Sequence, residues 1–194
     1  MINLYACGRA EDILDALPHR IFVPQIAAGE LGKGTEEARH ELAFLQGLIS
    51  GARLDILELS EAGFDMYARL VAGPRSLGDG EAATLAIALD QRLLPVIDER
   101  KARSRLTEIA PSASAATTVD LLLHDHVQNE MGRDACADAV WSALQGANMS
   151  VRLEQRDSIL ALIGHERATK CRSLPGYKRM CQAIESARRQ GAAS

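Results

Sequence analysis

The feature that most constrains the fold is a helix that begins at two glycines and is followed closely by a short apolar strand. Gly78 and Gly80 interrupt the chain, and the Ala/Leu/Ile run at 82–89 has a high helix propensity. Asp79 is suited to cap this helix. The apolar run at 93–97 contains β-branched residues, which is typical of a strand buried on both faces. A helix and a strand in this order predict an α/β fold with a mostly parallel sheet.

Acidic residues lie at the start of this helix and directly after this strand. Glu81 falls in the first turn of the helix, and Asp98 and Glu99 end the strand. In an open parallel sheet, the carboxyl ends of strands and the adjoining helix N-termini share one edge, so these acids are placed to meet one cation. Carboxylate oxygens suit Mg²⁺ or Mn²⁺. Each acid taken singly is also explained as a helix cap or an ordinary loop residue.

Strand-like and helix-like segments alternate up to about residue 127, which predicts a sheet flanked by helices. The expected strands are 20–23, 54–59, 93–97 and 115–119. The expected helices are 10–17, 25–31, 36–49, 61–71, 82–89, a basic helix from about 100 to 106 or 109, and 120–127. Beyond this point only helices are expected, at 134–145, 155–163 and 176–189. We therefore expect an α/β domain at 1–127 and a helical extension at 128–194 that packs on it.

The residues around the acids also resemble a known family. The pattern Leu-x-x-Gly-Glu-Ala from Leu77, the Ala/Ile-rich helix, and the strand followed by Asp-Glu-Arg-Lys-Ala-Arg are similar to the PIN domain, in the prokaryotic branch near the VapC-type toxin ribonucleases. Residues 20–31 resemble the family's second strand, proline and acid-bearing helix. Residues 2–4, with Gly8-Arg9 and Ile13-Leu14, resemble the end of its first strand and its first helix.

The resemblance extends over residues 1 to about 122 and implies a three-layer PIN-like fold. It implies that Glu30, Glu81 and one or both of Asp98 and Glu99 are catalytic, metal-binding acids. We expect Glu30, Glu81 and Asp98 to converge as the principal ligands, with Glu99 as an alternate or a supporting acid. It also implies Mg²⁺ or Mn²⁺ as the cofactor and RNA as the substrate. An antitoxin or a second copy of the chain is a candidate partner.

One position of the family pattern is missing from the given sequence. The family's first strand ends in an Asp a few residues before the segment that 2–4 matches, and the sequence begins after that point. We expect a Mg²⁺- or Mn²⁺-dependent endoribonuclease if that Asp lies upstream of the given start. Without that Asp, we expect a catalytically inactive module that binds nucleic acid or protein, or a subunit whose role is assembly through the helical extension.

Basic and hydroxyl residues near the acids suit a nucleic-acid substrate. Arg100, Lys101 and Arg103 follow the acidic pair and are expected to hold a phosphate backbone, although charge runs usually form a solvated face. Asp79, Thr117 and Thr118 are candidates to bind a metal-coordinated water.

Composition excludes several other classes. The net charge of −4 argues against a broadly basic DNA-binding protein. No apolar run approaches the roughly 18–20 residues that span a bilayer, and the given start lacks a secretory signal pattern, so we expect a cytoplasmic protein. The 4 cysteines lack zinc-site spacing and are expected to be free thiols. The nucleophile-elbow pattern and a Gly-rich phosphate loop are absent from the sequence.

Overall fold

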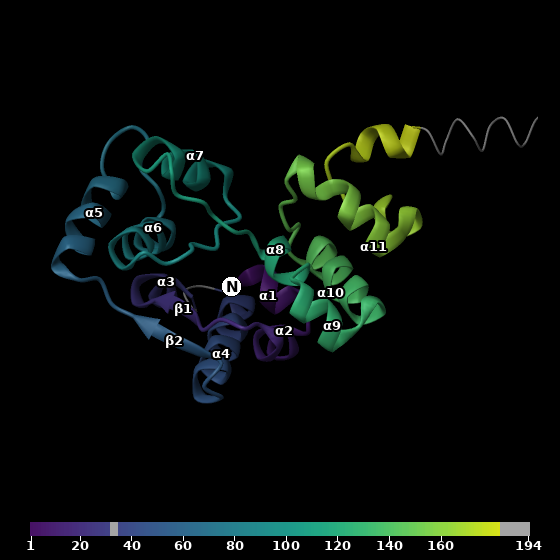
Figure 1. Ribbon diagram of the computed structural model, residues 1–194, viewed down its shortest axis with the longest axis horizontal. Coiled ribbons are helices and arrows are strands. Elements are labelled where there is room, and N and C mark those ends of the chain that lie inside the picture. The colour runs from purple at the N-terminus through teal and green to yellow at the C-terminus, as the bar shows by residue number, and fades with distance from the viewer. Residues whose placement is uncertain (32–34, 183–194) are drawn as a thin grey trace, which may run out of the picture.

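The computed structural model describes residues 1–31 and 35–182 and shows a mixed α/β fold, in which helices surround a small parallel sheet (Figure 1). β1 (Ile21–Pro24) pairs in parallel with β2 (Leu54–Leu57), with Ile21 opposite Leu54 and Pro24 opposite Leu57. The chain crosses from β1 to β2 through α3 (Gln25–Glu30) and α4 (Glu36–Ser50). This order confirms the parallel sense predicted from the alternation of strands and helices.

Two of the predicted strands were wrong in extent. The segments 93–97 and 115–119 contribute one isolated parallel bridge, between Val96 and Ala116. A strand buried on both faces needs neighbours that cover it. Leu94 is instead 61% exposed. Thr117 caps α8 (Thr118–Leu122), so the expected strand 115–119 turns into a helix at its midpoint.

The expectation that residues 2–4 end a strand was also wrong. They lie in α1 (Ile2–Ala6), a short helix whose Leu4 side chain is buried. Cys7 follows three residues later and is also buried, so the two side chains share one face, as helical spacing predicts. This face packs against α10 (Arg133–Gly146), a contact between segments far apart in the sequence.

The helices form two groups on either side of α1 and the N-terminus (Figure 1). One group holds α5 (Glu61–Val71), α6 (Asp79–Gln91) and α7 (Arg100–Ile109). The other holds α2 (Ala10–Ala16), α8, α9 (Asp125–Met131), α10, the 3₁₀ turn η1 (Leu153–Gln155) and α11 (Arg156–Ala168). None of the helices in the described residues is both long and apolar enough to cross a membrane.

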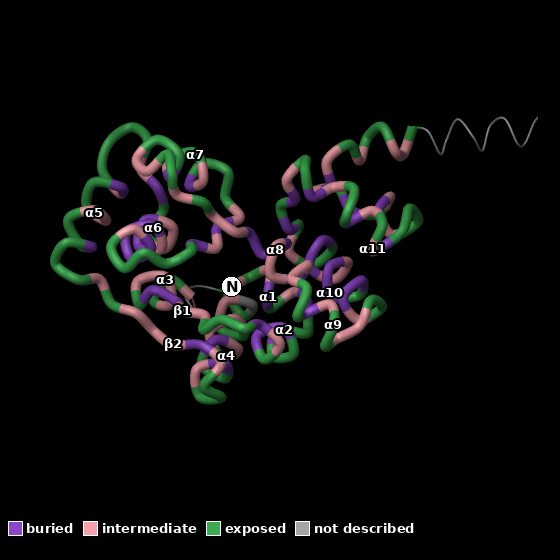
Figure 2. Tube along the Cα trace, viewed as in Figure 1, coloured by how far each residue is buried: buried purple, intermediate pink, exposed green. Residues whose placement is uncertain are grey.

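α6 is the most deeply buried helix of the first group. Ala82, Ala83, Leu85 and Ala86 have no measurable exposure, and Figure 2 shows α6 coloured largely as buried. Small alanine side chains allow α3 and α5 to approach α6 closely. A smaller apolar cluster holds α5, α6 and α7 together.

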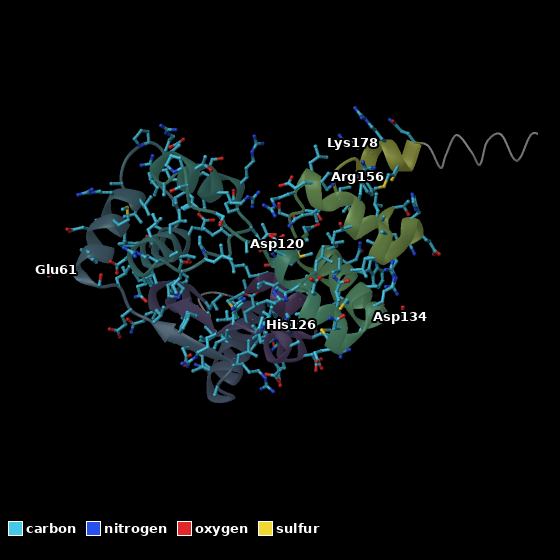
Figure 3. All side chains as sticks on the ribbon, in the orientation of Figure 1. Glu61, Asp120, His126, Asp134, Arg156 and Lys178 are labelled. Carbon is cyan, nitrogen blue, oxygen red and sulfur yellow. The ribbon has the colours of Figure 1, made fainter. Side chains whose placement is uncertain are left out.

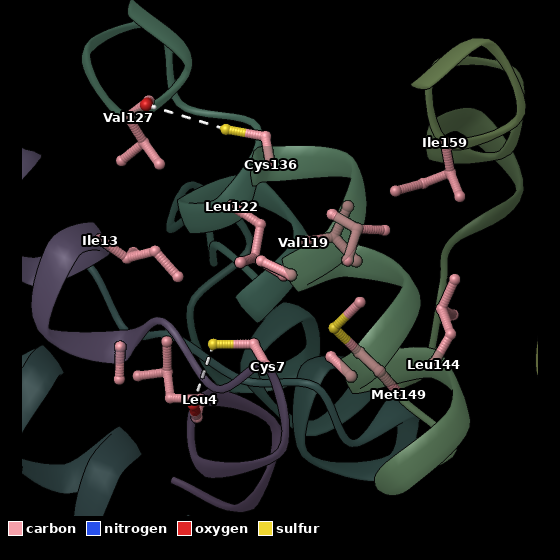
Figure 4. Packing of buried hydrophobic residues seen from close by; sticks show 14 of the residues in the cluster. Leu4, Cys7, Ile13, Val119, Leu122, Val127, Cys136, Leu144, Met149 and Ile159 are labelled. Atoms are coloured by element: carbon pink, nitrogen blue, oxygen red, sulfur yellow. Dashed lines mark hydrogen bonds between the residues drawn. The ribbon is translucent and has the colours of Figure 1, made fainter. Parts of the chain in front are cut away.

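The main hydrophobic core crosses residue 127. It includes Leu4 and Val23 as well as Leu144 and Ile159, and Figure 4 shows part of it between α1, α8 and α10. Residues from both sides of position 127 thus contribute to one core. The division into a domain at 1–127 and an extension at 128–194 stays a prediction. The expected helix 176–189 is seen as helix at 177–182, and the rest of it lies outside the described residues.

The cysteines are free thiols, as predicted, and three of them are buried. Cys7 Sγ donates a hydrogen bond to the Leu4 carbonyl, and Cys136 Sγ donates one to the Val127 carbonyl (Figure 4). Trp141 is half-buried against the main core, with the Arg167 guanidinium 5.1 Å from its ring centroid. These contacts indicate structural roles for the buried cysteines and for Trp141.

Candidate functional site

Three of the predicted acids gather around the N-terminus of α6. Glu30 ends α3, Glu81 lies in the first turn of α6, and Glu99 is the residue before α7. α3 crosses α6 at Gly80, where an added Cβ would overlap Glu30 Oε2 and lie 3.3 Å from the Ala27 Cβ. A glycine at this position therefore lets the Glu30 carboxylate rest directly over the start of α6.

The environment of Glu81 disfavours its charged form. Burial raises the pKa of Glu81, and repulsion from Glu99 and Glu30 raises it further, while the Gly78 backbone N–H and Lys101 oppose the shift. Glu81 Oε2 accepts a 3.3 Å hydrogen bond from that N–H, which caps the helix. Since the two other carboxylates repel Glu81, a cation held among the three would favour its ionised form.

Asp98 is held by residues of α1 and α8. Asn3 Nδ2 donates to Asp98 Oδ2 at 2.6 Å, and the Thr118 backbone N–H donates to Asp98 Oδ1 at 2.8 Å. The Thr118 hydroxyl also donates to Asp98 Oδ2. The Met1 amino group lies nearby, where burial lowers its pKa against the attraction of Asp98 and Glu41. Asp98 thus links three segments through both of its carboxylate oxygens.

The partners of Asp98 were missed by sequence reasoning. Asn3 belongs to the segment that was expected to be a strand, and Thr118 was expected to lie in the last strand. Asn3 and Thr118 are 95 and 20 positions from Asp98 along the chain, so no local sequence pattern links them to it.

Thr117 is occupied by a second network at the start of α8. Its hydroxyl donates to Asp120 Oδ2 at 2.9 Å and accepts from Gln155 Nε2 at 2.9 Å. Asp120 also accepts the Thr117 backbone N–H, and both of its oxygens accept from Arg152 at 3.1 and 3.0 Å. The structure places the Thr117 hydroxyl in a helix cap, and the Thr-x-x-Asp spacing is the sequence signal for that cap. Figure 3 labels Asp120 beside α8.

The pKa of Asp120 is shifted in the opposite direction to that of Glu81. Burial by itself acts to raise the pKa of Asp120, but its hydrogen bonds to Thr117 and Gln155 and the charge of Arg152 outweigh burial and lower it. Asp120 is therefore a structural anion that connects α8 to η1, and Arg152 and Gln155 are its partners from the helical extension.

The basic residues that were expected to bind phosphate divide into two kinds. Arg103 donates to the carbonyls of Ile97 and Asp98, and Lys101 donates to the Ser76 carbonyl. Arg100 is exposed at the start of α7, directly after Glu99. Arg100 is therefore the best placed of the three to contact a phosphate group.

Asp79 is at the first position of α6 and accepts a 3.0 Å hydrogen bond from the Tyr67 hydroxyl. That bond raises the pKa of Tyr67, with smaller contributions from burial and from the charges of Asp79 and Glu30. Asp79 and Tyr67 therefore border the group formed by Glu30, Glu81 and Glu99, which we call the acidic group.

The described residues contain no group of three or more His, Cys, Asp or Glu side chains that could hold a metal ion in this arrangement of the side chains. Comparisons with models of known families, with characterised proteins and with solved structures found no match for this chain. The chemistry of the acidic group and the sequence resemblance are therefore the grounds on which a function is proposed.

Proposed function

We propose that this protein is a Mg²⁺- or Mn²⁺-dependent ribonuclease with a PIN-like three-layer arrangement, and that its cation binds at the acidic group. The observation that carries the proposal is the approach of Glu30, Glu81 and Glu99, from three segments of the chain, at the N-terminus of α6. Hard divalent cations favour carboxylate oxygens. Burial is the main cause of the raised pKa of Glu81, and the charges of Glu99 and Glu30 add to it, which supports a site where a cation would be favourable.

A bound cation at this position would supply an activated water and neutralise charge on the attacked phosphate. The protein's own part is to orient the substrate. Arg100 is exposed next to Glu99 and is suited to hold a neighbouring phosphate of an RNA strand. Lys101 and Arg103 fix the loop that carries Asp98 and Glu99, through their bonds to backbone carbonyls.

The hydrogen bonds that Asp98 accepts favour a second candidate function, that of a binding module without catalytic activity. Both of its carboxylate oxygens accept hydrogen bonds from Asn3 and Thr118, so a cation would have to compete with these donors. In this alternative the protein binds nucleic acid, an antitoxin-like partner or a second copy without cutting RNA.

Cleavage of a fluorogenic RNA with and without Mn²⁺ distinguishes the two functions. For the nuclease, Glu81→Gln and Glu99→Gln should each lower kcat/KM by on the order of 100-fold, equivalent to about 2.7 kcal/mol of transition-state stabilisation. Glu130→Gln, at an exposed position of α9, is the matched control and should leave cleavage unchanged. RNA binding without Mn²⁺-dependent cleavage would support the binding module. Cleavage at the same rate without Mn²⁺ and in both variants would refute the metal mechanism.

A further inference from the structure

A cavity of about 820 Å³ lies between β1 and the segment 93–96. All of β1 lines one side, and Leu93, Leu94, Pro95 and Val96 line the other. Leu93 and Leu94 are 36% and 61% exposed, which is unusual for two successive leucines beside a strand. We call this cavity the slot.

The backbone edge of β1 forms one long wall of the slot, and the segment 93–96, which makes one parallel bridge, forms the other. β1 pairs with β2 on one edge, and the described residues place no strand on its other edge. On the opposite wall, the Pro95 carbonyl accepts from Ala116 N–H at 2.9 Å and Ile97 N–H donates to the Ala116 carbonyl at 2.8 Å. In a parallel ladder the intervening residue directs its N–H and C=O to the opposite edge, so those of Val96 are directed toward the slot.

The two walls run in the same direction. β1 leads into α3 and Glu30, the segment 93–97 leads into Glu99, and Glu30 and Glu99 both act on Glu81. The carboxyl ends of both walls therefore lie at the same end of the slot. A chain inserted parallel to β1 can pair with β1 on one side and with Val96 on the other.

Two histidines and an arginine lie at the amino-terminal end of the slot. His19 precedes β1 and contacts His124, with their ring centroids 6.2 Å apart. Arg92, which is exposed, precedes the other wall, and all three residues line the slot. Arg20 also lies at this end and is paired with Asp55. The charge of Arg92 favours a negatively charged group at this entrance, and the histidine rings offer N–H donors to it.

We propose that the slot binds an extended segment of another protein, inserted as a parallel strand between β1 and Val96. About four residues would pair, since β1 spans Ile21–Pro24. Apolar side chains of that segment would cover Leu93 and Leu94, and one or two acidic residues would precede it, facing Arg92 and the histidines. The unused backbone groups on both walls select an extended peptide, because a compact ligand cannot satisfy two parallel strand edges together.

The test is selection of a random peptide library displayed on phage against the full chain, followed by fluorescence polarisation with labelled synthetic copies of the enriched peptides. The enriched sequences should contain an acidic residue followed by alternating β-branched or aromatic residues. Leu94→Asp should weaken their binding at least about tenfold, equivalent to about 1.4 kcal/mol. Leu153→Asp, at a residue that is 73% exposed and outside the slot, is the control and should have no effect.

Two further measurements examine the strand geometry directly. A central strand uses the N–H groups of alternate residues on each side, so N-methylation of the peptide in either alternate set should weaken binding. Hydrogen exchange of the wild-type chain should slow at Val96 and within β1 when peptide is added, and this readout does not depend on a variant. Selection of no peptide, equal binding to Leu94→Asp, or tolerance of N-methylation in either set would overturn the proposal.

Discussion

Three carboxylates near the carboxyl end of the strands show how strongly the surroundings of a residue determine its role. Glu81 is partly buried among other acids, and its pKa is raised. Asp120 accepts bonds from Thr117, Gln155 and Arg152, and its pKa is lowered despite partial burial. Asp98 accepts bonds from Asn3 and Thr118. In the sequence all three are acids at the ends of predicted segments. Their neighbours in the folded protein give them different pKa shifts and different hydrogen-bond partners.

Glu81→Gln should stabilise the protein at neutral pH. Because folding raises the pKa of Glu81 above its reference value of 4.5, the folded state binds a proton where the unfolded state has lost it, and the free energy of unfolding falls as pH rises through that interval. Glutamine removes this penalty and still accepts the Gly78 N–H bond. Thermal unfolding of both proteins at several pH values measures the effect.

The difference in Tm between wild type and Glu81→Gln should be largest near neutral pH and vanish below about pH 4. Glu130→Gln, on the exposed face of α9, is the control and should show no such trend. A constant Tm difference across this range would contradict the assignment of a raised pKa to Glu81.

At the scale of elements, the close crossing of α3 and α6 decides where Glu30 lies. The crossing occurs at Gly80, which leaves room for the Glu30 carboxylate and the Ala27 side chain. α6 is capped by the Glu81 bond to Gly78, and its alanines permit close packing on both sides. The acidic group is thus a product of helix packing.

Gly80→Ala should displace the Glu30 carboxylate while changing stability by less than about 1 kcal/mol. Alanine favours the helix by up to about 1 kcal/mol, and its contact with Ala27 opposes this gain. Moving Glu30 removes part of the repulsion on Glu81, so the pKa of Glu81 should fall and Mn²⁺ affinity should weaken. Carboxyl NMR titration and Mn²⁺ binding by electron paramagnetic resonance measure the two effects.

Gly29→Ala is the matched control, because an added Cβ at Gly29 in α3 meets no atom within 4 Å. It should leave the pKa of Glu81 and the Mn²⁺ affinity unchanged. Identical results for the two alanine variants would show that the α3–α6 crossing does not set the position of Glu30.

At the scale of the whole molecule, the described chain has one main core and one smaller cluster. The main core joins α1, α2 and β1 to helices from α8 to α11. The smaller cluster holds α5, α6 and α7. The Asp120 network adds a polar link between α8 and η1. Residues on both sides of position 127 therefore stabilise the same core.

A fragment of residues 1–127 should fail to unfold cooperatively, because α1 would lose the packing surface that α10 provides. Chemical denaturation monitored by circular dichroism tests this. In the full chain, Leu144→Ala, at a residue that is 1% exposed, should keep a single transition and cost about 2–5 kcal/mol. A stable fragment with a sharp transition would show that 1–127 is an independent domain.

The sequence by itself determined most of the helices and both paired strands. The predicted helices 36–49 and 61–71 correspond to α4 and α5, because each begins at a hydroxyl cap and carries a local apolar periodicity. The predicted strand 20–23 contains most of β1 and the predicted strand 54–59 contains all of β2, because short apolar runs between turn residues are local signals. These features depend on neighbours within a few residues along the chain.

Only the tertiary structure decided which acids approach one another and which strands form. Asp98 and Glu99 are adjacent in sequence, yet one is held by Asn3 and Thr118 and the other acts on Glu81. The segment 93–97 has the composition of a strand but forms one bridge, because its pairing depends on a neighbouring chain segment. Hydrogen bonding between strands and repulsion between carboxylates act through space, so no local pattern in the sequence determines them.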